Sequence, residues 1–283
     1  VEKPSLCGPC EEPTAHWVYV IATGQAERVP GRRPASYWYK SRRVLTQQLR
    51  LAGIAQEERE DLPLVNALRE DVKRWRAGGY EGATQVTKDL LAYWWRADRP
   101  RRLFFCQLEA AETVIFLNEI RLPHKYLRFT PAFRDEDLAQ LHDGDLLRMG
   151  LKMATGSGKT VVMAMLIAWA FCNRGKVSSD TRFPKAALVV CPNLTIKERL
   201  QVLRPEAVGN YYEDFDIVPA RMRPMLNQGR VMITNWHLFL PESEHVEGGE
   251  SYTVVNKGPE GPDAFARRVL DDLYAAAPLL VLN

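Results

Sequence analysis

The stretch Met153-Ala154-Thr155-Gly156-Ser157-Gly158-Lys159-Thr160 decides the fold, because its composition is typical of a loop that binds the phosphates of a nucleoside triphosphate. Gly156 and Gly158 permit positive φ, which lets successive backbone amides point at one anion. Lys159 offers an ammonium group to the β- and γ-phosphates, and Thr160 offers a hydroxyl to Mg²⁺. Met153 departs from the strict pattern, which has glycine at this position. We expect ATP to be bound by Thr155, Gly156, Ser157, Gly158, Lys159 and Thr160, with Lys159 and Thr160 as the catalytic residues and Thr160 as the Mg²⁺ ligand.

Short apolar strands and helices alternate around this loop. A strand is predicted over residues 147–153 and a helix over residues 159–173. Further strands are predicted over residues 186–191, 230–234 and 279–282, with a helix over residues 195–203. Residues 241–264 contain several glycines and prolines and are predicted to form a surface insertion. The alternation predicts an α/β fold with a parallel sheet covered by helices.

The first hundred residues differ in pattern from the remainder of the chain. Apolar residues recur three or four positions apart over residues 41–76, which predicts helix there. Helices are also predicted over residues 84–95 and 104–120. The first hundred residues carry the whole formal net charge of +3. We expect a mainly helical, basic region over residues 1–100, followed by the nucleotide-binding domain over residues 101–283.

One stretch of the basic region, residues 28–56, contains cations and no acidic residue. Its cations are interleaved with the aromatic residues Tyr37, Trp38 and Tyr39. Such a stretch is typical of a surface that contacts a polyanion. We expect Arg42 and Arg43 to contact nucleic-acid phosphates, and a solvated helix face is the alternative.

Composition excludes several classes of protein. With 46% hydrophobic and 26% charged residues, the chain has neither the composition of a disordered protein nor that of a coiled coil. Its longest apolar run, residues 161–172, is shorter than the roughly 20 residues that cross a bilayer, and we expect no secretory leader. An odd number of cysteines indicates reduced thiols, and we expect Cys7-Gly8-Pro9-Cys10 to form a turn, the alternatives being a redox centre and half of a zinc site. We expect a cytoplasmic protein without a membrane partner.

Several segments resemble motifs of the superfamily 2 DEAD/DEAH-box helicases and translocases. Residues 154–160 resemble motif I, and residues 104–110 resemble the upstream glutamine motif, in which the amide of Gln107 would read the edge of adenine. Residues 188–195 are similar to motif Ia, and residues 231–237 resemble a later motif at the end of a strand. The resemblance implies contacts with nucleic-acid phosphates at Pro192, Asn193, Thr195, Thr234 and Asn235.

More narrowly, the chain resembles the N-terminal part of the type III restriction enzyme helicase (Res) subunit. The residues that carry this resemblance are 11–13, 31–34, 75–80, 104–112, 152–165, 210–212 and 234–237. The resemblance implies an ATP-dependent motor that acts on duplex DNA in a restriction or phage-defence system, with ATP and Mg²⁺ as cofactors. It also implies a DNA methyltransferase or specificity subunit as a partner, with the nuclease elsewhere.

The same resemblance implies that the chain is an N-terminal fragment. In the family, residues 279–283 would lead directly into an Asp-Glu-Ala-His motif, whose carboxylates hold Mg²⁺ and polarise the attacking water. The chain ends at Asn283, so we expect an incomplete RecA-like parallel sheet with flanking helices, and no ATP hydrolysis by this chain alone. Two alternatives to a DNA motor stay open. They are a helicase that acts on RNA and a nucleotide-binding module that docks a partner without hydrolysing ATP.

Overall fold

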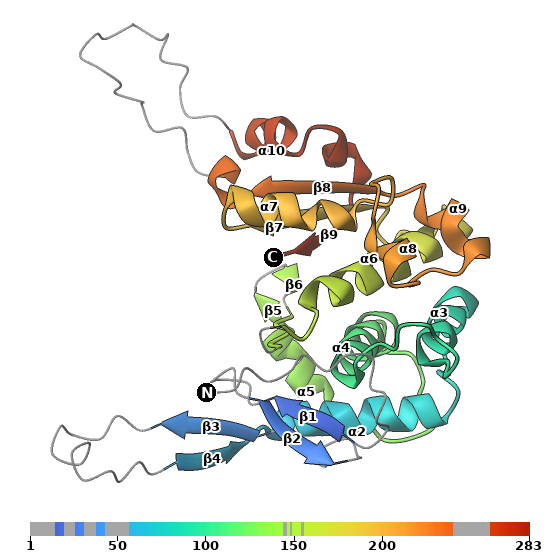
Figure 1. The fold of residues 1–283 in the computed structure, drawn as a ribbon, viewed down its shortest axis with the longest axis vertical. Helices are drawn as coiled ribbons and strands as arrows, with labels where there is room; N and C mark the ends of the chain where they lie inside the picture. The colour runs from blue at the N-terminus through green and yellow to red at the C-terminus, as the bar shows by residue number, and fades with distance from the viewer. Residues whose placement is uncertain are drawn as a thin grey trace, which may run out of the picture. The chain divides into compact units, whose positions relative to one another are not determined.

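The computed structural model describes residues 15–19, 26–30, 38–42, 57–143, 146–147, 149–153, 156–239 and 261–283 (Figure 1). The chain divides into two compact units, Val1–Val162 and Met163–Asn283. This division falls inside a helix, and the predicted domain boundary at residue 100 stays a prediction. None of the helices in the described ranges is long and apolar enough to cross a bilayer.

Two antiparallel strand pairs lie in the N-terminal part of the first unit. Strand β1 (Ala15–Tyr19) pairs with β2 (Ala26–Pro30), and β3 (Trp38–Arg42) pairs with β4 (Glu57–Asp61). The helix predicted over residues 41–76 is therefore wrong at residues 41–42 and 57–61. Strand β4 is a run of charged residues without the apolar spacing of a helix. In register, Arg42 lies opposite Glu57.

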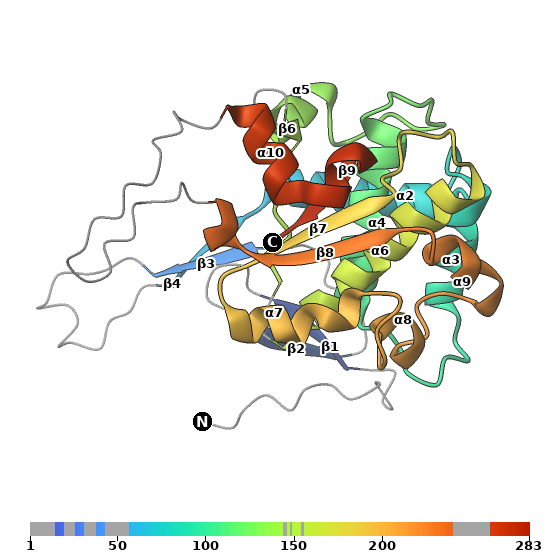
Figure 2. The same cartoon turned by 90° about the horizontal axis from the view of Figure 1, so that it is seen from above.

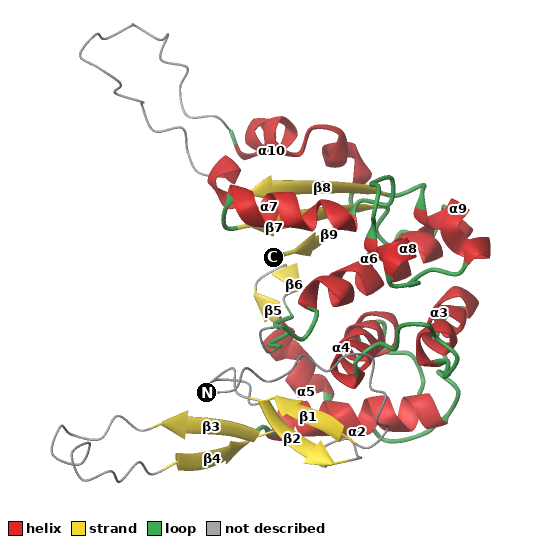
Figure 3. Cartoon of the chain, viewed as in Figure 1, coloured by secondary structure: helices red, strands yellow, loops and turns green. Residues whose placement is uncertain are grey.

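Helices form most of the first unit from residue 63 onward (Figure 3). Helix α2 (Pro63–Ala77) begins at a proline, whose fixed φ suits the first turn. Helix α3 (Gln85–Trp95) is capped by Thr84, whose hydroxyl accepts a hydrogen bond from the Thr87 amide. Helix α4 (Phe105–Phe116) continues into a π-helical turn, η1 (Leu117–Arg121). These elements confirm the helices predicted over residues 84–95 and 104–120.

The segment that leads toward the predicted phosphate loop differs from its prediction. Helix α5 (Asp135–Leu138) and the 3₁₀ turn η2 (Ala139–Leu141) precede a short antiparallel pair, β5 (His142–Asp143) and β6 (Leu146–Leu147). The strand predicted over residues 147–153 is wrong, because β6 ends at Leu147 and residues 149–153 form no strand. In the described part of the chain, β6 pairs with β5, and an apolar run becomes a strand only where another strand offers its backbone.

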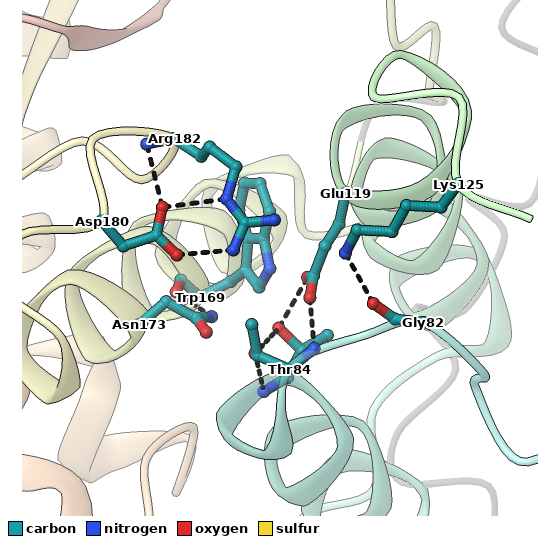
Figure 4. Close-up of polar contacts among 9 residues, drawn as sticks. Gly82, Thr84, Glu119, Lys125, Trp169, Asn173, Asp180 and Arg182 are labelled. Atoms are coloured by element: carbon teal, nitrogen blue, oxygen red, sulfur yellow. Dashed lines mark hydrogen bonds and ion pairs between the residues drawn. The ribbon is translucent and has the colours of Figure 1, made fainter.

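Apolar packing and polar bonds together hold α3 against α4. Trp94 of α3 and Phe116 of α4 are almost completely buried, so Trp94 belongs to the core. Glu119 of η1 accepts a hydrogen bond from the Thr84 amide (Figure 4) and another, at 2.7 Å, from the Thr87 hydroxyl. Because Thr84 and Thr87 form the first turn of α3, the Glu119 carboxylate ties that turn to the end of α4.

Glu112 of α4 is a fully buried carboxylate where α2, α3 and α4 meet. Its Oε1 accepts hydrogen bonds from Arg76 Nε at 2.8 Å, Tyr80 OH at 2.7 Å and Trp95 Nε1 at 2.8 Å. Its Oε2 accepts from Arg76 Nη2. Burial, followed by the charge of Glu112, raises the pKa of Tyr80, so that the phenol stays a neutral donor. One carboxylate thus binds α2, the turn after it and α3.

The second unit contains a parallel sheet. In the described residues its strands are β7 (Ala186–Cys191), β8 (Arg230–Asn235) and β9 (Leu279–Leu282), in the order β8-β7-β9. Both pairings are parallel. This sheet confirms the predicted α/β class and the strands predicted over residues 186–191, 230–234 and 279–282.

Helices surround this sheet. They are α6 (Lys159–Lys176), which begins in the first unit, α7 (Leu194–Leu200), η3 (Gln201–Leu203), α8 (Tyr211–Asp214), η4 (Ala220–Met222), α9 (Arg223–Leu226), η5 (Trp236–Phe239), α10 (Pro262–Leu270) and η6 (Asp271–Ala276). Figure 2 shows α7 and α10 on opposite sides of β7 and β8. Most of the surface insertion predicted over residues 241–264 lies outside the described residues; its described end, residues 261–264, is exposed, and α10 begins there at Pro262.

Local polar bonds fix the segment that connects α6 to β7. Arg182 donates to Asp180 from Nε at 2.9 Å and from Nη2 at 2.6 Å (Figure 4), and these bonds lower the pKa of Asp180. On α6, Asn173 Nδ2 donates to the carbonyl of Trp169 at 2.8 Å. The neighbouring thiol of Cys172 is completely buried, and burial raises its pKa to about 12.

Candidate functional site

The predicted phosphate loop has the backbone conformation that its glycines suggested. Gly156 has φ of +80° and Gly158 has φ of +77°, values in the left-handed region that other residues reach only with strain. Ser157 between them is buried, and α6 begins directly afterwards at Lys159. The loop is therefore followed directly by the N-terminus of an 18-residue helix, whose dipole attracts anions. Ala154 and Thr155 lie outside the described residues.

Lys159 is exposed and reaches back across the loop. Its Nζ donates a hydrogen bond to the carbonyl of Met153 at 3.0 Å. This hydrogen bond goes to a neutral acceptor, and a phosphate oxygen would offer the ammonium a stronger charged acceptor. Thr160 follows in the first turn of α6 and is partly buried. Their roles as catalytic residues, and that of Thr160 as a Mg²⁺ ligand, stay predictions.

Gln107 lies directly against this loop. Its side chain is 4% exposed, its Oε1 accepts from the Phe104 amide at 2.9 Å, and its Nε2 donates to the Ser157 carbonyl at 3.0 Å. The first bond completes the N-terminus of α4 and the second holds the loop. These two bonds use one N–H of Nε2 and one lone pair of Oε1, and the amide has a second N–H and a second lone pair. Recognition of adenine by Gln107 stays a prediction. The sequence predicted that Gln107 and the loop belong to one site, and the structure shows a direct hydrogen bond between Gln107 and Ser157.

The same contact explains why position 158 must be glycine. A Cβ added there would lie 2.1 Å from Gln107 Nε2 and 3.3 Å from Gln107 Cδ. A methyl group cannot approach an amide nitrogen so closely. Gly158 therefore combines two requirements, a positive φ and space for the Gln107 side chain.

A cavity of about 480 Å³ lies in the first unit between α2, α4 and residues 149–153. Its wall is mostly apolar, with Leu68, Val114 and Phe133 among the lining residues, and the ion pair between Arg69 and Glu109 (2.9 Å) lies in it. Gln107 is not among the residues that line this cavity. Sequence reasoning missed the cavity, because it forms only where α2 meets α4.

The residues predicted to contact nucleic acid in the second unit lie at the carboxyl ends of two paired strands. Cys191, the last residue of β7, lies opposite Asn235, the last residue of β8. Asn193 caps α7, accepting from the Ile196 amide through Oδ1 at 2.9 Å. Pro192, Asn193 and Thr195 are exposed and Asn235 is partly buried. Thr234, by contrast, is 5% exposed and lies inside the unit.

The two predicted contacts in the basic region belong to the first unit. Arg42 ends β3 and faces Glu57 in register. Arg43, Cys7 and Cys10 lie outside the described residues. Strand β3, which lies in the stretch without acidic residues, is therefore paired with β4, which is rich in glutamate. The sequence did not predict this pairing. Nucleic-acid contacts at Arg42 and Arg43 stay predictions.

The described residues contain no group of histidine, cysteine, aspartate and glutamate side chains suited to a metal ion. Cys106, Cys172 and Cys191 are buried and form no disulfide.

A known protein family matches part of the chain. Residues 106–241 match the family described as type III restriction enzyme, res subunit. This match begins one residue before Gln107 and includes the phosphate loop, β7 and β8. No curated protein and no solved structure matches the chain.

Proposed function

We propose that the chain is the ATP-binding part of a translocase on duplex DNA, because residues 106–241 match the type III restriction enzyme Res subunit family, a family of superfamily 2 helicase-type domains. The observation that carries this proposal is the loop at residues 156–160, with two left-handed glycines before α6 and Gln107 bonded to Ser157. We also propose that the chain acts in a restriction or phage-defence system in the cytoplasm. Its partner there would be a DNA methyltransferase or specificity subunit.

The residues of the loop suit ATP and Mg²⁺. Gly156 and Gly158 adopt the left-handed backbone that lets successive amides point at one anion, and the N-terminus of α6 adds its dipole. Lys159 would exchange the Met153 carbonyl for the β- and γ-phosphates, and Thr160 would offer its hydroxyl to Mg²⁺. Bound MgATP supplies a phosphoryl group that can be transferred to water.

The carboxyl ends of β7 and β8 support a nucleic-acid contact. Exposed Asn193 and Thr195 lie at the start of α7, where backbone amides and short polar side chains suit phosphate oxygens. Contacts of this kind carry no sequence information and do not separate DNA from RNA. An RNA-directed helicase is therefore the alternative within the same class.

A second candidate function is a nucleotide-binding module that docks a partner. The observation that favours it is the chemistry of the strand ends, where β7 is followed by Pro192 and Asn193 and β8 ends at Asn235. Asn193 and Asn235 provide side-chain amides at these strand ends, and neither provides a carboxylate to hold Mg²⁺ or activate water. We expect this 283-residue chain to bind ATP and to hydrolyse it no faster than background.

Binding measurements test the proposed motor function without relying on turnover. A motor couples its nucleotide and DNA sites, typically with about 1–3 kcal/mol of free energy. We expect a non-hydrolysable ATP analogue with Mg²⁺ to change the affinity for a labelled duplex DNA by about fivefold or more. Fluorescence anisotropy at fixed salt measures this change, because phosphate contacts make affinity strongly salt-dependent.

Two controls make the result interpretable. Lys159→Ala should keep the nucleotide-free DNA affinity and lose the response to nucleotide. Unlabelled duplex RNA competing better than duplex DNA would support the RNA-directed alternative. Nucleotide binding without any effect on either nucleic acid would contradict the motor and favour the docking module.

A further inference from the structure

Strand β8 leads into an exposed aromatic pair. Trp236 and His237 open the turn η5, and their ring centroids lie 4.1 Å apart with 35° between the ring planes. Trp236 is 43% exposed, and none of the four residues of η5 is buried. Both residues belong to the segment 231–237 that resembles a helicase motif at the end of a strand, and neither was predicted to contact a ligand.

Hydrogen bonds fix one side of this pair. Asn235 Oδ1 accepts from the His237 amide at 3.1 Å and lies 2.7 Å from His237 Nδ1. The backbone N–H is a donor, so the atom of Asn235 that faces it is the amide oxygen. His237 Nδ1 must then carry a proton and donate as well. The imidazole is oriented by two bonds to one neighbour, and the indole of Trp236 packs on it.

Apolar packing fixes the other end of the turn. Phe239, the last residue of η5, packs against the core cluster formed by Ala186, Leu188, Leu273 and Ala276. Trp236 and His237 therefore face solvent while both ends of their turn are anchored. A preorganised aromatic surface loses little conformational entropy when a ligand stacks on it.

The position of the pair indicates the kind of ligand. Open parallel sheets bind ligands at the carboxyl ends of their strands, and Trp236 directly follows the carboxyl end of β8. Helix α7, which packs beside β8 (Figure 2), carries the cations Lys197 and Arg199. Aromatic rings next to cations are the combination by which proteins hold unpaired nucleotides, with stacking for the base and positive charge for the phosphate.

We infer that Trp236, supported by His237, stacks on an unpaired base of a nucleic-acid strand at the carboxyl end of β8. This inference rests on the proposed nucleic-acid function and deepens it by naming a base contact beside the phosphate contacts. Stacking on a ring face discriminates little between bases, so the contact suits a motor that moves along any sequence.

The test uses the whole chain and two probes, a single strand that contains 2-aminopurine and a blunt duplex without unpaired bases. For Trp236→Ala we expect about tenfold weaker binding of the single strand, together with loss of the 2-aminopurine quenching. Binding of the blunt duplex should not change. Trp236→Phe should restore most of the affinity, because it keeps a ring. Tyr126→Ala, which removes an 80% exposed aromatic side chain in the other unit, is the matched control and should behave as wild type.

The outcomes separate this inference from the function on which it rests. If the wild-type chain binds neither probe, the proposed function fails and the inference fails with it. If the wild type binds but Trp236→Ala keeps its single-strand affinity and quenching, the inference alone is overturned. An equal loss for both probes, or a lower melting temperature of Trp236→Ala than of Tyr126→Ala, would identify Trp236 as a structural residue and also overturn it.

Discussion

Replacing Gly158 with alanine is expected to weaken ATP binding at least tenfold. The backbone at this position has φ of +77°, which costs about 1–2 kcal/mol for a residue with a Cβ. The added methyl group would also lie 2.1 Å from Gln107 Nε2, so Gln107 must move and release the Ser157 carbonyl. The nucleotide-free loop should relax away from this conformation, and ATP binding must then restore it. Since about 1.4 kcal/mol corresponds to a factor of ten in affinity, this cost exceeds tenfold. Titration of a fluorescent ATP analogue measures the change.

Two further variants separate the causes. Gly79→Ala has the same backbone problem, φ of +70°, but no atom lies within 4 Å of the added Cβ. It should lower stability and leave ATP affinity unchanged. In a Gln107→Ala background the steric conflict is absent, so Gly158→Ala should cost less there, with a coupling of about 0.5–3 kcal/mol. Fully additive losses would mean that the Gln107 contact does not govern position 158.

Glu112→Ala is expected to lower the free energy of unfolding by about 3–5 kcal/mol, the usual result of breaking a buried ion pair. The substitution leaves the Arg76 guanidinium, the Tyr80 hydroxyl and the Trp95 indole without their shared acceptor. Glu112→Gln keeps the volume and one acceptor oxygen, so its cost should be smaller. Urea denaturation followed by circular dichroism measures both.

Glu70→Ala is the matched control for Glu112→Ala. Glu70 lies on α2 and pairs with Lys73 at 3.6 Å, with side chains that are 55% and 68% exposed. An exposed pair of this kind contributes about 0–1 kcal/mol. A similar loss for the two variants would show that Glu112 does not hold α2 and α3 against α4.

Local sequence was sufficient for the features that depend on neighbouring residues. Gly156 and Gly158 predicted left-handed backbone because few other residues adopt it, and the structure confirms it. The strand at residues 186–191 has its predicted bounds, since its apolar run is bounded by Pro184 and Pro192. The start of α6 at Lys159 likewise follows from the loop that precedes it.

Features that depend on distant residues could not be predicted. The bond from Gln107 to Ser157 joins residues 50 positions apart, and the Arg76–Glu112 pair joins residues 36 positions apart. The strand expected over residues 147–153 failed for the same reason, because strands need partners that the sequence does not name. The pairing of Arg42 with Glu57 could not be predicted either, because it places a glutamate opposite a stretch that contains no acidic residue of its own.

The central claim is that residues 156–160 bind the phosphates of ATP through Lys159. The most direct test is a titration of a fluorescent ATP analogue with Mg²⁺ into the wild-type chain, Lys159→Ala and Lys152→Ala. Lys152 is an exposed cation just before the loop, so its removal matches the change in net charge. We predict saturable binding by the wild type and Lys152→Ala, and about 10- to 100-fold weaker binding by Lys159→Ala, from loss of a charge-assisted bond. Equal affinity of the wild type and Lys159→Ala would contradict the assignment of this loop as the ATP site.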